Sequence, residues 1–93
     1  MKRSAIIRNN RNYLLKTIEP NDELIDSLIY LNCVTEEQRN FILKQCSNQN
    51  KNAELLRLVR SFDDTKFTKF VKCLRQTKQK TVARIMENGG GSQ

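Results

Sequence analysis

Residues 18–35 read IEPNDELIDSLIYLNCVT, and they are the clearest indication of the architecture of this chain. Four apolar residues recur there at helical spacing: Leu24, Ile25, Leu28 and Ile29. Three acidic residues lie off that stripe: Asp22, Glu23 and Asp26. The stretch therefore predicts a short amphipathic helix with an acidic outer face, followed after a small turn by a second helix.

The boundaries of these two helices follow from capping residues. The first should span Asp22–Leu31, with Asn21 or Asp22 as its N-cap and Asn32 as a left-handed residue after its end. The second should run from Glu36 to about Cys46, because Thr35 with Gln38 fits the capping-box pattern. Its apolar side is predicted from the spacing of three residues: Phe41, Ile42 and Cys46.

The segment before this stretch predicts a helix over residues 3–18. Ile7, Leu14 and Ile18 recur at spacings of seven and four, and Pro20 ends the segment because a residue before proline leaves the helical conformation. Arg11 falls within the same arc. Either the helix bends near Asn9-Asn10, or Arg11 packs its stem at the rim and keeps its charge in water.

Three more helices are predicted downstream. Residues 47–50 form a polar turn, and a helix from Lys51 to Phe62 follows, with an inward face made of Leu55, Leu56, Val59 and Phe62. Asp63-Asp64 ends it and caps the next helix, whose inward face is Phe67, Phe70, Val71 and Leu74. Thr77 can cap the last helix, with Val82, Ile85 and Met86 inward. The sum is about six short helices.

The composition indicates one domain with an uneven charge. The chain has 93 residues and a net charge of +7. Residues 1–16 contain no acid, residues 19–37 contain no base, and residues 66–84 are basic again. This balance permits contact with nucleic acid, an acidic membrane or an acidic protein surface. The acidic middle block suits an interaction module better than a nucleic-acid binder.

The residue types argue against an enzyme and against a metal site. The chain has no histidine, the commonest general acid–base group. Its three cysteines, Cys33, Cys46 and Cys73, are far apart and contain no C-x-x-C pair, so we expect free thiols, no zinc and no cofactor. No segment has the pattern of a signal peptide or a membrane span. The expected location is the cytoplasm, without membrane contact.

Six short motifs follow one another in the order and spacing of one known family. They are Arg11-Asn12-Tyr13-Leu14, Ile25-Asp26-Ser27-Leu28-Ile29, Val34-Thr35-Glu36-Glu37, Lys51 with Leu55-Leu56, Phe67-Thr68-Lys69-Phe70-Val71, and Leu74-Arg75-Gln76-Thr77-Lys78-Gln79. Together they resemble the caspase-recruitment domain, or CARD, of the death-fold superfamily. The last motif resembles one found in the CARDs of initiator caspases. We expect a CARD-like domain over residues 1–88 and a flexible glycine-rich tail over residues 89–93.

Five places in the chain differ from the family pattern. Asn32 and Lys78 stand where glycine is usual, and residues 61–64 replace a common Arg-Gly pair. Gln49 and Ala53 stand where some initiator caspases carry basic residues that bind their scaffold. The last difference weakens the expectation that this chain binds a partner as those caspases do.

The resemblance implies an all-α fold, a compact antiparallel six-helix bundle of the Greek-key, death-fold type. It also implies homotypic assembly, in which a basic face meets an acidic face on the next subunit. The candidate basic face is Arg8, Arg11, Lys51 and Arg57. The candidate acidic face is Asp22, Glu23, Asp26, Glu36 and Glu37. The expected partners are other CARD-containing proteins, either caspases or scaffolds, and the chain itself.

Several alternatives stay open. Arg11 can be an interface anchor or a rim residue of its own domain, and Asp26 can receive a partner's arginine or fix the first helix internally. Glu36 and Glu37 can simply be first-turn acids that suit the helix dipole.

For the whole chain, the leading hypothesis is recruitment of a caspase or its scaffold in cell-death or innate-immune signalling. A small nucleic-acid-binding domain and a CARD-only inhibitor of assembly are the alternatives.

Overall fold

The computed structural model describes residues 3–88 and folds them into α-helices joined by short turns. The helices are α1 (Arg3–Asn9), α2 (Arg11–Thr17), α3 (Asp22–Tyr30), α4 (Glu36–Leu43), α5 (Asn48–Arg60), α6 (Asp64–Gln76) and α7 (Lys80–Asn88). No strand occurs among the described residues. The tail predicted for residues 89–93 lies outside them.

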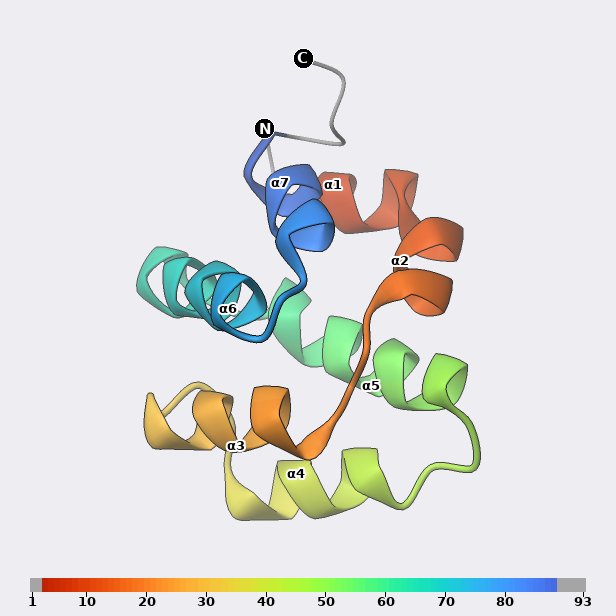
Figure 1. Ribbon diagram of the computed structural model, residues 1–93, viewed down its shortest axis with the longest axis vertical. Coiled ribbons are helices and arrows are strands. Elements are labelled where there is room, and N and C mark those ends of the chain that lie inside the picture. The colour runs from red at the N-terminus through yellow and green to blue at the C-terminus, as the bar shows by residue number, and fades with distance from the viewer. Residues whose placement is uncertain (1–2, 89–93) are drawn as a thin grey trace.

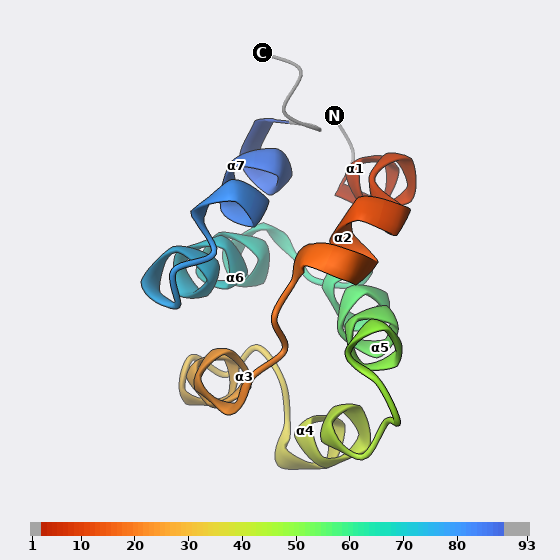
Figure 2. The same cartoon turned by 45° about the vertical axis from the view of Figure 1, so that its right-hand side comes forward.

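The helices are arranged in three levels along the long axis of the molecule (Figures 1 and 2). At one end lie α1, α2 and α7, and at the other end lie α3 and α4, with α5 and α6 between them. Helix α5 packs against α1, α2 and α4, and α6 packs against α3 and α7. The predicted all-helical bundle of the death-fold type is confirmed, with its first helix divided into α1 and α2.

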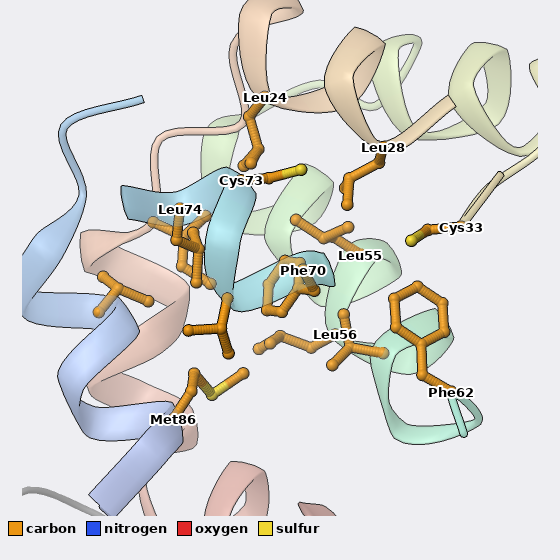
Figure 3. Packing of buried hydrophobic residues seen from close by; sticks show 14 of the residues in the cluster. Leu24, Leu28, Cys33, Leu55, Leu56, Phe62, Phe70, Cys73, Leu74 and Met86 are labelled. Carbon is orange, nitrogen blue, oxygen red and sulfur yellow. The ribbon is translucent and has the colours of Figure 1, made fainter. Parts of the chain in front are cut away.

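The core is built on the inward faces of α5 and α6. Phe70 is fully buried and meets Phe62 edge to face, with 6.3 Å between the ring centres (Figure 3). The residues predicted to face inward on α5, on α6 from Phe70 onward and on α7 at Val82 and Met86 are all buried. Phe67 and Ile85 are only partly buried, at the edge of the core. The apolar spacing of the sequence therefore located the core correctly.

Asn10 interrupts the first predicted helix. Its backbone leaves the helical region at φ −116° and ψ 17°, and its side-chain Nδ2 donates to the carbonyl of Ile6 at 2.8 Å. An asparagine side chain that bonds nearby backbone in this way competes with the helix. The predicted bend near residues 9–10 is confirmed, and Arg11 is exposed whereas Leu14 is fully buried.

Local capping residues begin most of the remaining helices. The side chain of Asn21 caps α3 by accepting from the amide of Leu24 at 2.9 Å, and Thr35 and Gln38 form the predicted capping box of α4. Asp63 caps α6 as predicted. Two described residues other than glycine have positive φ: Asn32 at 64° and Lys78 at 67°. Both stand where the family usually has glycine, the residue that adopts this conformation without strain.

Three predicted boundaries were wrong. Helix α4 ends at Leu43, so Cys46 is exposed and Phe41 keeps 42% of its surface in water. Residues 48–50 are the first turn of α5, because Ser47 acts as an N-cap and accepts from the amide of Asn50. Thr77 ends α6 instead of starting α7, since its hydroxyl donates to the carbonyl of Cys73 at 2.9 Å.

Candidate protein-interaction surfaces

Two buried amide side chains hold the connection between α2 and α3. Nδ2 of Asn52, on α5, donates to the carbonyls of Leu15 at 2.9 Å and Ile18 at 2.8 Å. Gln79, in the turn before α7, accepts from the amide of Glu19 at 2.9 Å and donates to its carbonyl at 3.1 Å. These bonds hold the end of α2 and the residues after it against α5 and the turn before α7.

Sequence reasoning missed both amides, although one had a visible signal. Asn52 lies three residues before Leu55 and four before Leu56, in register with the inward face of α5. A polar residue on an apolar face predicts a buried hydrogen bond. Gln79 offered no comparable sign, since it lies in a polar turn and its partner is 60 residues away.

Two of the four candidate basic residues lie at the α1–α2 end. Arg8 is in the last turn of α1, and Arg11 is in the first turn of α2. Both are exposed. The ion pairs in the described part of the chain are Arg39–Asp26, Arg57–Glu54 and Arg75–Glu87. Among those residues, Arg8 and Arg11 therefore have no acidic partner.

Arg11 stands at an electrostatically unfavourable place for its own helix. The start of a helix carries a partial positive charge, and a cation there typically loses about 0.3–1 kcal/mol relative to an acid. The first turn of α2 contains no acid, and Asn10 makes no side-chain cap bond to it. The local fold therefore offers no reason for a positive charge at this position.

The other two basic candidates lie where the basic and acidic surfaces meet. Arg57 is exposed and pairs with Glu54 one turn earlier at 3.0 Å. It borders a hollow that also contains Glu37 and the exposed ring of Phe41. Lys51 is half-buried and lines a hollow whose other residues include two acidic candidates: Asp22 and Glu23. The structure does not bring all four basic candidates to one separate face.

The acidic candidates are grouped on the packed pair α3 and α4. Asp22 and Glu23 are in the first turn of α3, and Glu36 and Glu37 are in the first turn of α4. All four are exposed. Each therefore stabilises the start of its own helix, as the helix dipole favours. Their positions are explained by the fold, so they are weaker indications of binding than Arg11 is.

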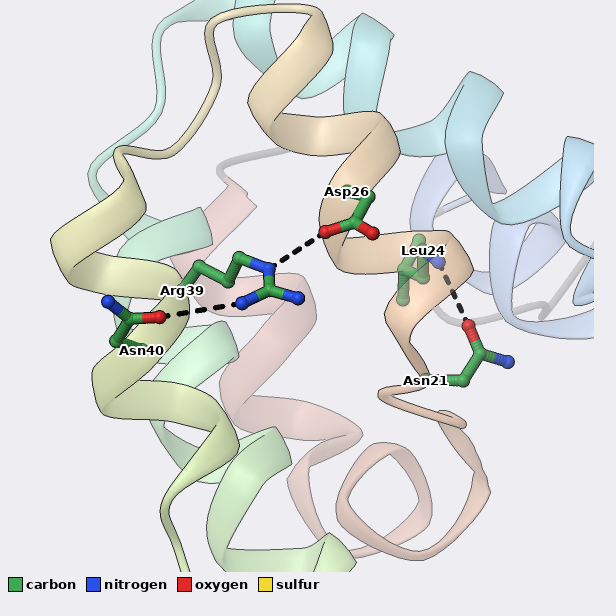
Figure 4. Close-up of polar contacts among 5 residues, drawn as sticks. All are labelled: Asn21, Leu24, Asp26, Arg39 and Asn40. Carbon is green, nitrogen blue, oxygen red and sulfur yellow. Dashed lines mark hydrogen bonds and ion pairs between the residues drawn. The ribbon is translucent and has the colours of Figure 1, made fainter.

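Asp26 has an internal partner that the sequence did not predict. Nε of Arg39, on α4, donates to Oδ1 of Asp26 at 2.8 Å (Figure 4). The pKa of this guanidinium is raised by that hydrogen bond and, to a smaller extent, by the charges of Asp22 and Glu36. The internal contact of Asp26 is thus with α4 and not with the first helix. Thirteen residues separate the pair, so no helical spacing could reveal it.

The cysteines lack the features of a nucleophile or a metal site. Cys33 and Cys73 are buried, and burial raises the pKa of both thiols, that of Cys73 to about 11. They are therefore protonated at neutral pH, whereas the reactive form is the thiolate. Cys46 is exposed and free. No group of three potential metal ligands occurs in residues 3–88.

A comparison with known protein families gives a match over nearly the whole chain. The family model of the caspase recruitment domain matches residues 4–89. The chain belongs to the CARD family. A comparison with curated proteins finds no match. This CARD is therefore a protein–protein interaction domain with the death fold, as the sequence motifs suggested. None of its described helices has the length and apolar character needed to cross a bilayer.

Proposed function

We propose that this CARD recruits or oligomerises a caspase, or a scaffold that activates one, in cytoplasmic cell-death or innate-immune signalling. A basic surface on one subunit docks on the acidic surface of the next. The basic surface is centred on Arg8 and Arg11, with Lys51 and Arg57 at its border. The acidic surface consists of Asp22, Glu23, Asp26, Glu36 and Glu37. The domain is not an enzyme and works without a cofactor.

The observation that carries this proposal is the position of Arg11. It is exposed, it has no acidic partner in the described part of the chain, and it lies where a helix disfavours a cation. Such a residue contributes nothing evident to its own fold, and arginine is enriched among the residues that dominate binding energy. A docking role on a partner's carboxylates accounts for it.

The placement of the two surfaces supports assembly rather than closed pairing. Helices α1 and α2 lie at one end of the long axis, and α3 and α4 lie at the other (Figures 1 and 2). A contact between different surfaces on two copies is heterologous, and it yields rings or filaments instead of a symmetric dimer. A subunit that offers only one working surface would cap the growing end, which is how a CARD-only inhibitor would act.

Charge reversal tests the proposal. We expect Arg11→Glu and Glu23→Arg each to weaken self-association, measured by sedimentation velocity, by at least about tenfold, because like charges then meet across the contact. Glu23 is preferable to Asp26 here, since replacing Asp26 also breaks the internal pair with Arg39. An equimolar mixture of the two variants should regain a dimer without forming longer polymers, since only one charge-matched contact remains. Unchanged association in both variants would reject this interface.

One observation favours nucleic-acid binding as the second candidate. Residues 64–88 contain seven basic residues and two acidic ones, so most of the net charge of +7 lies on α6, α7 and the turn between them. Duplex binding should then weaken steeply with salt, with a slope of roughly −0.9 per phosphate contact in log K against log salt. Neutralising Lys72, Lys80 and Arg84 together should abolish such binding and leave self-association intact.

A further inference from the structure

A hollow lined by cations lies where the turn between α6 and α7 meets the end of α2, and its volume is about 460 Å³. The cations are Arg75, Lys78 and Lys80, and the acid in the lining is Glu19. Arg75 pairs with Glu87, whereas Lys78 and Lys80 have no acidic partner among residues 3–88. Because cations outnumber acids in this hollow, it attracts a negatively charged group.

Thr81 offers a hydroxyl group at this hollow. It lines the hollow, is exposed and is the second residue of α7. Lys78 and Lys80 precede it by three residues and by one, and Arg84 follows it by three. Arg84 is exposed on the same face of α7, because residues three apart are neighbours on a helix. The hydroxyl of Thr77 donates to a carbonyl one turn back, but that of Thr81 makes no hydrogen bond within residues 3–88.

A second threonine has the same position in its helix without the hollow. Thr65 is the second residue of α6 and is exposed. It stands beside Asp63, which caps α6, and Asp64, an acid of the first turn. Both threonines lie at a helix start, where the dipole favours negative charge. The cations of the hollow, and not the helix start, therefore distinguish Thr81 from Thr65.

We infer that Thr81 is a phosphorylation site for a serine/threonine protein kinase that selects basic residues around its acceptor, and that the hollow holds the resulting phosphate. In the reaction, Oγ1 of Thr81 bonds to the γ-phosphorus of ATP as the bond from that phosphorus to the β-phosphate oxygen breaks. The hydroxyl proton passes to a base of the kinase, and ADP leaves. Thr81 lies outside the two surfaces of the proposed function, so the inference does not depend on them.

The phosphate would change both the stability and the charge of this region. It carries a charge of about −1.5 to −2 at neutral pH and three acceptor oxygens, which cations and helix starts stabilise. Lys78, Lys80 and Arg84 have no competing ion pair among the described residues and are its nearest donors along the chain. Residues 64–88 contain seven basic residues and two acidic ones, so the modification would remove much of the charge on which duplex binding depends.

The segment around Thr81 can open locally for a kinase, which binds its acceptor in an extended conformation. Opening breaks the two hydrogen bonds between Gln79 and Glu19 and the backbone bond from Ala83 to Gln79 at 3.1 Å. It also releases Lys78 from its positive φ of 67°, which is unfavourable for a residue with a side chain. The segment belongs to the last turn and the last helix of the described chain, where local opening costs least.

The first test is phosphorylation of the folded 93-residue chain by the catalytic fragment of protein kinase C with ATP. Peptide mass spectrometry should find the phosphate on Thr81. The double variant Lys78→Gln/Lys80→Gln should slow modification of Thr81 about tenfold, because the basic flanks attract the kinase. Lys66→Gln/Lys72→Gln removes the same charge from exposed positions on α6 and should stay within about twofold of the parent. No phosphate on Thr81, or equal rates in the two double variants, would overturn the inference.

The second test asks whether the hollow holds the phosphate. The phosphorylated chain should melt roughly 2–6 °C above the unmodified chain, and Thr81→Glu should reproduce part of this gain. Thr65→Glu is the matched control, since it places an acid at the same position of α6 beside two acids. It should gain less than half as much as Thr81→Glu. Equal gains would mean that the helix dipole alone acts, and they would reject a role for the hollow.

The third test reads the surroundings of the phosphate directly by phosphorus-31 NMR. The second pKa of a phosphothreonine is about 6 without charged neighbours, and nearby cations lower it because they favour the dianion. The pKa should therefore be lower in the folded phosphorylated chain than in the same chain unfolded in urea. Arg84→Gln should reduce this difference. An equal pKa in the folded and unfolded chains would show that the phosphate lies free in water and would refute the site.

Discussion

The start of α2 and the starts of α3 and α4 are built in opposite ways. Each of the latter two helices has a side-chain N-cap and two acids in its first turn. Helix α2 has no side-chain cap bond, begins with Arg11 and is held at its far end by Asn52, which belongs to α5. One end of the domain is therefore specified by neighbouring residues in the chain, and the other by a contact across the fold.

The contrast between these helix starts indicates how to weigh exposed charges as candidates for binding. The acids at the starts of α3 and α4 stabilise their own helices, so their presence is explained without a partner. Arg11 has no such explanation. A charge that the fold does not need is the better indication of a surface under functional constraint.

The largest change in stability should follow from removing the hydrogen bonds that Asn52 makes to the end of α2. Asn52→Ala should lower the free energy of unfolding by about 2–3 kcal/mol, because the carbonyls of Leu15 and Ile18 lose a buried donor. Removal of Oδ1, which has no partner among the described residues, offsets part of the loss. Urea denaturation followed by circular dichroism measures the resulting change in the free energy of unfolding. Asn50→Ala, at an exposed position on the same helix, should change stability by less than about 0.5 kcal/mol.

A smaller effect is expected from removing a local cap. Thr35→Ala deletes one half of the capping box of α4, and we expect it to cost about 1 kcal/mol, or roughly 4–8 °C in melting temperature. Thr65→Ala, an exposed threonine inside α6, serves as the control and should melt close to the parent chain. If Thr35→Ala lowered the free energy of unfolding as much as Asn52→Ala does, α4 would depend on contacts across the fold as much as α2 does.

The smallest expected change in stability comes from two charge reversals, which should shift the free energy of unfolding in opposite directions. Arg11→Glu should raise the free energy of unfolding by about 0.3–1 kcal/mol, because it places an acid at a helix start, and Glu23→Arg should lower it by a similar amount. Both variants should also weaken self-association. Arg60→Glu, in the last turn of α5, should destabilise because a cation is favoured there. If Arg11→Glu instead destabilised the domain in calorimetry, Arg11 would have a structural role.

The helical bundle, its core and several helix starts could be predicted from the amino-acid sequence alone. Apolar residues at helical spacing identified Phe70 and the faces of α5 and α6, and the cap of α4 follows from residues three apart. These features depend on interactions within about one turn of helix, which spacing reveals. The family also followed from the order of such local motifs. The predicted start of α7 was wrong because a polar residue such as Thr77 can serve either the start or the end of a helix.

The surroundings of the charged residues became clear from the tertiary structure alone. It revealed the Arg39–Asp26 pair, 13 residues apart, and the ties made by Asn52 and Gln79 across 37 and 60 residues. It also placed Lys51 and Arg57 beside acids, at the border of the two surfaces. The physical reason is that a side chain's partner depends on how helices pack. Spacing along one helix indicates which face a residue occupies, but not which residue of another helix lies opposite it.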